Sequence, residues 1–179
     1  RLIAVCVIYF LALGVSAHLL DAVGGKTKPW GHLPKRKLWM VSMIVLAVAF
    51  LIGMYYAFLD SPLLFAIGIA EGFFLFAYNL ELFGGKFHNN ASTILSWAIL
   101  PVFAGSAIQT NSISLEAIML CGISSIITYV LITTSRKYKH LRCNNGNHSE
   151  IKRCETILKL LTIGVLGGTH FILVIKFFS

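Results

Sequence analysis

The sequence HLLDAVGGKTKPWGHLPKRK, residues 18–37, is a polar and basic connection between two apolar runs. The run before it covers about residues 2–20, and the run after it covers about residues 38–59. Each run is close to the roughly 20 apolar residues that an α-helix needs to cross a bilayer. The pattern therefore predicts two membrane-spanning helices joined by a basic loop.

The composition of the whole chain agrees with this pattern. Apolar residues make up 57% of the 179 residues and charged residues only 12%, about half of the charged fraction of a soluble domain. Further apolar runs lie at about 62–80, 91–109, 115–134 and 156–178. We therefore expect an all-α, polytopic transmembrane bundle with about six spans, in a single domain over residues 1–179.

The sequence begins with Arg1, and an apolar run follows at once. We expect that a further helix precedes it. Ser61 is predicted to cap the third helix, with Pro62 at its first helical position, and Ser114 to cap the fifth. In the fourth helix, Pro101 is expected to cause a kink and Gly105 to let a neighbouring helix approach closely.

Basic residues are concentrated in three of the connections between the apolar runs. These connections, at 21–37, 81–90 and 135–155, contain 12 of the 15 Lys and Arg residues. The connections at 59–61 and 110–114 contain none. Basic residues gather in cytoplasmic loops of membrane proteins. Topology therefore explains the net charge of +8 without a nucleic-acid partner, and we expect the three basic loops to be cytoplasmic.

His18 and Asp21 lie three residues apart at the end of the first apolar run, so that a helix places both on one face. A carboxylate and an imidazole there can hold a divalent cation or an ammonium group. The alternative is a helix end whose polar side chains only reach the water of the headgroup region.

Glu71 lies in the middle of the third apolar run, between Gly68 and Gly72. A carboxyl group at this depth costs several kcal/mol unless it is paired, protonated or in a wet cavity, so Glu71 is a candidate functional residue. The two glycines predict a close contact with another helix. The alternative is a protonated carboxyl group that only holds two helices together. Tyr78 lies on the same face, seven residues further on.

A polar segment follows Tyr78. Asn79, Glu81 and His88 offer oxygen and nitrogen ligands, and Lys86 adds a positive charge. The pair Gly84-Gly85 predicts a sharp turn. The alternative to a binding site is an ordinary helix end with a polar loop.

The order of these features resembles the UbiA-type intramembrane prenyltransferase superfamily. A helix that ends at His18 and Asp21, a basic segment with Pro29, a turn after Tyr78 and a helix with an internal proline carry the resemblance, which covers about residues 1–142. Members of this family are all-helical. They use Mg²⁺ and two Asp-rich motifs to ionise a prenyl diphosphate, and an acceptor then attacks the allylic carbon.

The resemblance implies that Asp21, Glu71 and Tyr78 are catalytic and that His18 and Asp21 hold Mg²⁺. It also implies a site for an isoprenoid diphosphate or polyprenyl lipid, made of Lys26, Lys28, Asn79, Glu81, Lys86, His88, Arg136 and Lys137. The resemblance is that of a divergent relative, because the segment 135–140, where the second motif would fall, contains no carboxylate.

The sequence leaves several functions open. The first is a UbiA-like protein that binds or transfers an isoprenoid, as a prenyltransferase or as a pseudoenzyme. The second is a non-catalytic subunit of a larger membrane complex with other membrane proteins as partners. The third is a carrier that uses Glu71 to bind a proton or an ion.

The topology generates the first prediction. Single cysteines placed in 59–61 or 110–114 should react with a membrane-impermeant thiol reagent from the side opposite to cysteines in 21–37 or 81–90. Measurement in sealed vesicles of known orientation checks this. Labelling of both sets from the same side would contradict the predicted alternation of the loops.

Overall fold

The computed structural model describes residues 1–24, 34–144 and 146–178 of the chain. These residues are overwhelmingly helical and contain no strand. The predicted all-α fold class is therefore confirmed. The helices form two compact units, Arg1–Ser125 and Ile126–Ser179.

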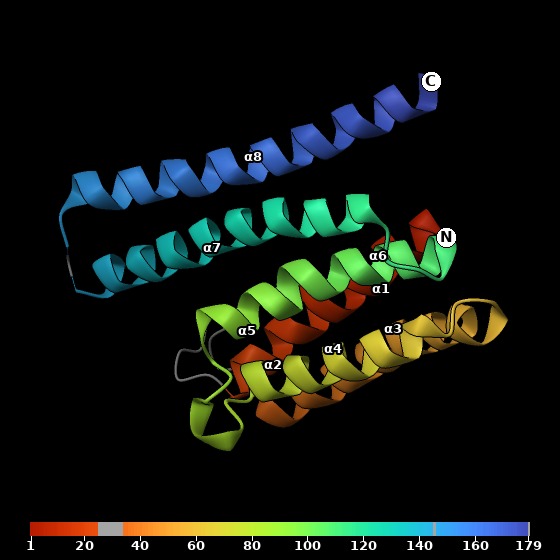
Figure 1. The fold of residues 1–179 in the computed structure, drawn as a ribbon. Helices are drawn as coiled ribbons and strands as arrows, with labels where there is room; N and C mark the ends of the chain where they lie inside the picture. Colours follow the sequence, from red (N-terminus) through yellow and green to blue (C-terminus); the bar gives the residue numbers. More distant parts are fainter. Residues whose placement is uncertain (25–33, 145, 179) are drawn as a thin grey trace. The chain divides into compact units, whose positions relative to one another are not determined.

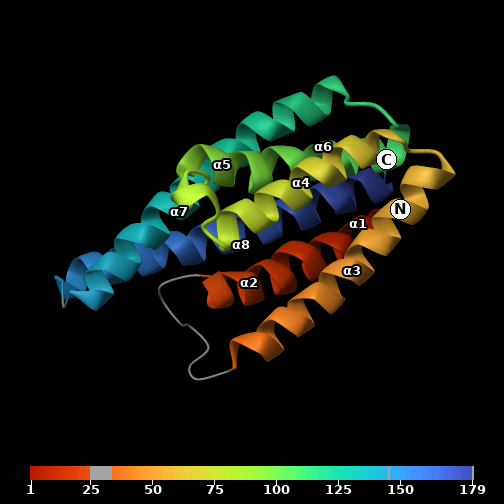
Figure 2. The same cartoon turned by 90° about the horizontal axis from the view of Figure 1, so that it is seen from below.

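The first unit contains four helical stretches that lie side by side and alternate in direction (Figures 1 and 2). The first stretch consists of α1 (Leu2–Tyr9), the π-helix η1 (Phe10–Ser16) and α2 (Ala17–Gly24). The second and third are α3 (Lys35–Leu59) and α4 (Leu63–Asn79). After the short 3-10 helix η2 (Phe83–Gly85), the fourth consists of α5 (Asn90–Ile94), the π-helix η3 (Leu95–Ile99) and α6 (Leu100–Thr110).

Among the described residues, four helical stretches are long and apolar enough to cross a membrane, judged by length and composition. They are Leu2–Gly24, Lys35–Leu59, Asn90–Thr110 and Leu115–Cys143. The apolar helix Leu63–Asn79 has 17 residues, a length of about 26 Å. This is slightly shorter than the roughly 30 Å of hydrocarbon in a bilayer. The helical bundle agrees with the sequence prediction, and the described helices that meet both the length and the composition criterion are fewer than the six spans predicted.

The start of α4 differs from the prediction. Among the described residues, no N–H of this helix donates to the hydroxyl of Ser61, which itself donates to the carboxylate of the preceding Asp60 at 3.1 Å. The N–H of Leu63 donates instead to the side-chain oxygen of Asn111, which lies in the turn after α6, at 3.2 Å. Pro62 precedes the first helical residue of α4. A residue distant in the sequence therefore takes over the role predicted for Ser61.

Other predicted helix features have mixed outcomes. Ser114 caps α7 (Leu115–Cys143) as predicted, and its hydroxyl accepts from the N–H of Ala117 at 3.2 Å.

The fourth stretch departs from a regular α-helix just before Pro101, where η3 forms a wider π-turn. Proline has no N–H for the carbonyl one turn earlier, so an irregular turn is expected there. The prediction for Gly105 is wrong, because a Cβ atom at this position would meet nothing within 4 Å.

The core of the first unit is built largely from small side chains. Ala104 and Ala107 of α6 pack with Ile67 of α4 in one cluster, and Ala17 and Leu20 of α2 form another with α4. Small residues let helices approach closely, which gives the van der Waals contacts that hold helices together in lipid. Many other large apolar side chains are exposed instead, as expected for a surface that contacts hydrocarbon tails.

A buried polar contact joins the first helical stretch to α3. The hydroxyl groups of Ser16 and Ser42 lie 2.7 Å apart, and each also bonds to the backbone carbonyl of the other residue. Both side chains are fully buried. This reciprocal arrangement satisfies two hydroxyl groups without water, and it fixes η1 against α3.

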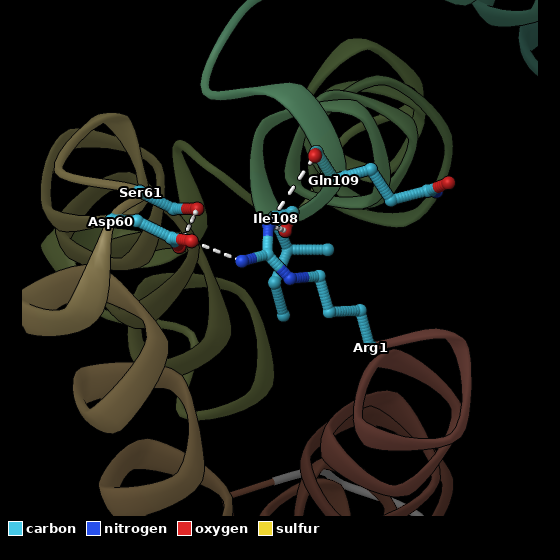
Figure 3. A network of polar contacts seen from close by, with 5 residues as sticks. All are labelled: Arg1, Asp60, Ser61, Ile108 and Gln109. Carbon is cyan, nitrogen blue, oxygen red and sulfur yellow. Dashed lines mark hydrogen bonds and ion pairs between the residues drawn. The ribbon is translucent and has the colours of Figure 1, made fainter.

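One end of the first unit is tied together by Arg1 (Figure 3). Its guanidinium pairs with Asp60 at the end of α3 and donates to the carbonyls of Ile108 at 2.8 Å and Gln109 at 3.3 Å, near the end of α6. Ser61 donates to the same Asp60 carboxylate. A cation is favourable at a helix C-terminus. Because the pair is partly exposed, it contributes only about 0–1 kcal/mol, but it links three helical stretches.

At the opposite end, α2 contacts the end of α4 through Gly24. A Cβ atom at Gly24 would lie 2.6 Å from the carbonyl oxygen of Asn79 and 2.8 Å from the Cα atom of Leu80. Only glycine fits between these backbone atoms. Gly24 is therefore held directly against Asn79 and Leu80 at the end of α4.

The second unit is a helical hairpin of the last part of α7 and α8 (His148–Phe178) (Figure 1). The two helices have 29 and 31 residues, which corresponds to about 44 and 46 Å. The connection expected at 135–155 is therefore mostly helical, because the basic residues continue both helices. Between the two helices, the described non-helical residues are Asn144, Gly146 and Asn147.

The contact at Gly24 generates the second prediction. Gly24→Ala should lower the free energy of unfolding by about 1–3 kcal/mol, because the added methyl group overlaps backbone atoms that cannot rotate away. Unfolding of the purified protein in mixed micelles measures this. The matched variant Gly105→Ala, where the methyl group meets open space, should be neutral or stabilising by up to about 1 kcal/mol. Equal effects of the two substitutions would contradict the tight contact.

Candidate functional site

A cavity of about 540 Å³ lies among the helices of the first unit. It follows α4 from Leu64 to Asn79, a distance of about 22 Å along the helix. Its volume falls within the range of about 300–1,000 Å³ that is typical of sites enclosing small molecules. The cavity is thus long and narrow rather than round.

The wall of the cavity is almost entirely hydrocarbon. The apolar lining residues come from α1, η1, α3, α4 and α6, and they include Ile8, Leu13, Met43, Leu46, Met54, Phe76 and Ile108. The polar side chains in the wall are those of Tyr9, Glu71, Asn79, Ser96 and Trp97. Such a surface suits a long apolar molecule with few hydrogen-bonding groups.

Glycines create part of this space. Gly53, Gly68 and Gly72 all line the cavity, and a Cβ atom at any of them would meet nothing within 4 Å. The close helix contact predicted at Gly68 and Gly72 is therefore wrong. Their missing side chains leave a hollow beside α4 instead of admitting a neighbouring helix.

Glu71 is paired within the wall of the cavity. The hydroxyl group of Tyr9, the last residue of α1, donates a hydrogen bond to its carboxyl oxygen Oε1. The bond joins α1 to α4. The carboxyl group of Glu71 therefore holds two helices together, as one interpretation of the sequence proposed. It also lines the cavity.

The sequence analysis missed Tyr9 as the partner of Glu71. A signal was present, because a tyrosine in the middle of an apolar run needs a partner for its hydroxyl group. The π-helix η1 begins at Phe10, directly after Tyr9. Such turns are frequent at functional sites, but the sequence pattern does not reveal them.

His18 and Asp21 lie on α2 as predicted, three residues apart. His18 is exposed, and its ring meets that of Trp97 edge-on at 6.3 Å, whereas Asp21 is half-buried. Among the residues that the structure describes, no three His, Cys, Asp or Glu side chains come together to hold a metal ion. The Mg²⁺ site stays a prediction. Lys26 and Lys28 lie outside the described residues.

Tyr78 and His88 come together at the end of α4. Their rings stack at 4.4 Å with an interplanar angle of 16°, and the His88 Nδ1 atom lies 3.3 Å from the carbonyl oxygen of Tyr78. Asn79 is buried, and its amide donates to the carbonyl of Leu75 at 2.7 Å. Because Gly24 touches Asn79, the end of α2 and this group lie at the same end of the cavity.

The turn predicted at Gly84-Gly85 is confirmed, since both glycines have positive φ values of 69° and 76°. Glu81 and Phe83 also adopt positive φ, at 50° and 57°, which is uncommon for residues with a side chain. Glu81 is half-buried and Lys86 is exposed. Neither of these two lines the cavity.

Arg136 and Lys137 belong to the second unit. The Nζ atom of Lys137 lies 3.3 Å from a carboxylate oxygen of Glu150 on α8. The predicted site residues thus fall into three places: Glu71 and Asn79 in the cavity wall, His18, Asp21, Tyr78 and His88 near one end of the bundle, and the basic pair in the hairpin.

Comparison with known proteins does not place this chain in a family. No family model, no curated protein and no solved structure matches this chain. The class is therefore defined by the molecule itself: an all-helical protein whose long apolar helices are compatible with integration into a membrane. The relation to the UbiA-type superfamily stays a prediction.

The Tyr9–Glu71 bond generates the third prediction. A double-mutant cycle of Tyr9→Phe and Glu71→Leu should give a coupling free energy of about 0.6 kcal/mol and at most about 1.7 kcal/mol, as is found for hydrogen bonds between membrane helices. Unfolding in mixed micelles measures it. Pairing Tyr9→Phe with Ser42→Ala, whose partner is Ser16, should give additive effects. A coupling of zero for the first pair would contradict the bond.

Proposed function

We propose that this protein is an integral membrane protein that holds the isoprenoid chain of a lipid-like ligand in the cavity of the first unit. The cavity carries the proposal. It is long, narrow and apolar, and a hydrocarbon chain can lie beside α4 with almost no polar group to desolvate. The sequence resemblance to isoprenoid-binding membrane proteins supports the choice of ligand class.

The affinity for such a chain must come from packing and not from exclusion of water. In a bilayer the competing environment of the ligand is itself hydrocarbon, so burial alone gains little free energy. A cavity whose wall contacts the chain along about 22 Å offers many dispersion contacts. Each is small, but together they favour a ligand of matching length and shape.

The polar end of the ligand is best accommodated near Asn79. Ser96 and Trp97 also line the cavity, and Trp97 contacts His18 on α2. Hydroxyl, amide and indole groups can bond to the headgroup of a prenol or a prenyl diphosphate. Glu71 lies eight residues away along α4, about 12 Å from this end, beside the apolar part of the ligand.

The proposed function is binding of an isoprenoid and does not include transfer of its prenyl group. Ionisation of a diphosphate needs divalent cations held mainly by oxygen ligands. The described residues offer at most Asp21 and His18 on α2, and they bring no third ligand of the usual kinds to these two. This set does not fit a cluster of Mg²⁺ ions, so no catalytic step is assigned to a metal.

A proton or cation carrier is the second candidate, because a carboxyl group lies in the wall of a cavity that follows much of the bundle. In proteoliposomes, a carrier of this kind should show ion flux that is lost in Glu71→Gln and kept in Ser42→Ala. Bound isoprenoid without flux favours the proposed function. Flux that depends on Glu71 favours the carrier.

The proposed function generates the fourth prediction. Geranylgeraniol and geranylgeranyl diphosphate should both raise the melting temperature of the wild-type protein in detergent, because a ligand that binds only the folded state stabilises it. In Gly72→Leu the new side chain enters the cavity, and the shift should be lost. Differential scanning fluorimetry measures it.

The matched control is Gly105→Leu, which adds the same side chain at a glycine that also has open space but does not line the cavity. It should keep the full shift. Two results would contradict the proposal: an unchanged shift in Gly72→Leu, or an equal shift with inorganic diphosphate, which has no hydrocarbon chain.

A further inference from the structure

A second pocket of about 340 Å³, lined in part by charged and hydroxyl side chains, lies between the two helices of the second unit. Its lining residues are Thr133, Thr134 and Lys137 of α7 and Glu150, Arg153, Cys154 and Ile157 of α8. None of them lines the cavity of the first unit. The isoprenoid-binding function proposed above does not involve this pocket.

The lining changes from charged to apolar along the hairpin. Glu150, Lys137 and Arg153 lie nearer the turn between the helices. Thr133 and Ile157 lie one helical turn further from it, at spacings of four residues from Lys137 and Arg153 that place each pair on one helix face. The pocket therefore has a cationic outer part and a less polar inner part.

The position along α7 matches the boundary of a bilayer. The apolar part of this helix ends near Thr134, and a basic segment from Arg136 to Arg142 follows. The helix is about 44 Å long, about 14 Å more than the hydrocarbon core. The excess carries the basic segment into the headgroup layer. The pocket lies where the apolar part of α7 ends and the basic segment begins. This is the depth at which the phosphate groups of phospholipids are found.

The side chains have the chemistry that phosphate requires. Arg153 forms no ion pair with any residue that the structure describes, and a guanidinium can bind two phosphate oxygens at once. Lys137 is held beside it by Glu150 at 3.3 Å. The hydroxyl group of Thr133 donates to the carbonyl of Tyr129 at 2.8 Å, so Thr134 is the hydroxyl donor for a ligand.

We propose that this pocket binds the phosphate group of an anionic phospholipid, with its oxygens on Arg153, Lys137 and Thr134. The acyl chains extend past Ile157 along the apolar faces of α7 and α8. Glu150 positions Lys137 and does not contact the ligand. The chemistry that is recognised is a phosphate ester, which a lipid supplies from the membrane and a soluble metabolite supplies from water.

Native mass spectrometry of the full chain in detergent tests the proposal, with phosphatidylglycerol as the probe. Arg153→Gln should weaken phosphatidylglycerol binding about tenfold or more, because it removes charge-assisted hydrogen bonds to phosphate. Lys137→Gln should weaken it in the same direction. Lys152→Gln removes the same charge one residue away, at a side chain that does not line the pocket, and should change the affinity less than about twofold, as expected for a surface charge that makes no contact with the ligand.

Circular dichroism and size-exclusion chromatography of each variant confirm that it is folded before its affinity is compared. Equal losses in Arg153→Gln and Lys152→Gln would overturn the proposal in favour of a general attraction between basic helices and anionic lipid. Displacement of phosphatidylglycerol by an equal concentration of inorganic phosphate or glycerol phosphate would assign the pocket to a soluble anion and would also overturn it. Retained binding of phosphatidylglycerol under that competition supports the lipid as ligand.

Discussion

A polar group inside the hydrocarbon of a bilayer must find its partner within the protein, because lipid tails offer none. The described residues of the first unit are compatible with that requirement. Tyr9 donates a hydrogen bond to Glu71 between α1 and α4, and the hydroxyl groups of Ser16 and Ser42 bond to each other between η1 and α3. Each contact fixes the rotation of one helix relative to another. Because Gly68 and Gly72 lie on the cavity side of α4 and have no side chains, the same arrangement leaves an apolar space next to the Tyr9–Glu71 pair.

The sequence predicts much of this fold for physical reasons. Long apolar runs form helices, and Ser114 and Gly84-Gly85 mark a helix start and a turn through local chemistry that depends only on their neighbours in the chain. The unusual position of Glu71 is also evident from the sequence. Its partner is not, because the rotation of α1 about its axis depends on contacts with several other helices. Ser61 shows the same limit, since Asn111, far away in the sequence, bonds to the N–H that Ser61 was expected to cap.

The glycines illustrate why the candidate site was harder to predict than the fold. A glycine in a membrane helix can admit another helix or leave a cavity, and the residue is the same in both cases. Gly24 admits another helix, whereas Gly72 leaves a cavity, although the sequence predicted close contact at Gly72. Of the residues implied by the family resemblance, Glu71 and Asn79 line the cavity, and His18, Asp21, Tyr78 and His88 lie near one end of it. The basic residues of the hairpin have a different environment, with Lys137 paired to Glu150.

The central claim is that a hydrocarbon chain lies inside the first unit and not merely on its surface. The most direct measurement is photo-crosslinking with a prenyl probe that carries a diazirine near the end of its chain, followed by mapping of the modified residues on α3 by mass spectrometry. The account predicts modification of Met43 and Met54, which line the cavity, that is competed by unlabelled geranylgeraniol. Modification confined to Ile44 and Leu51, which are 62% and 67% exposed on the outer face of the same helix, would contradict it.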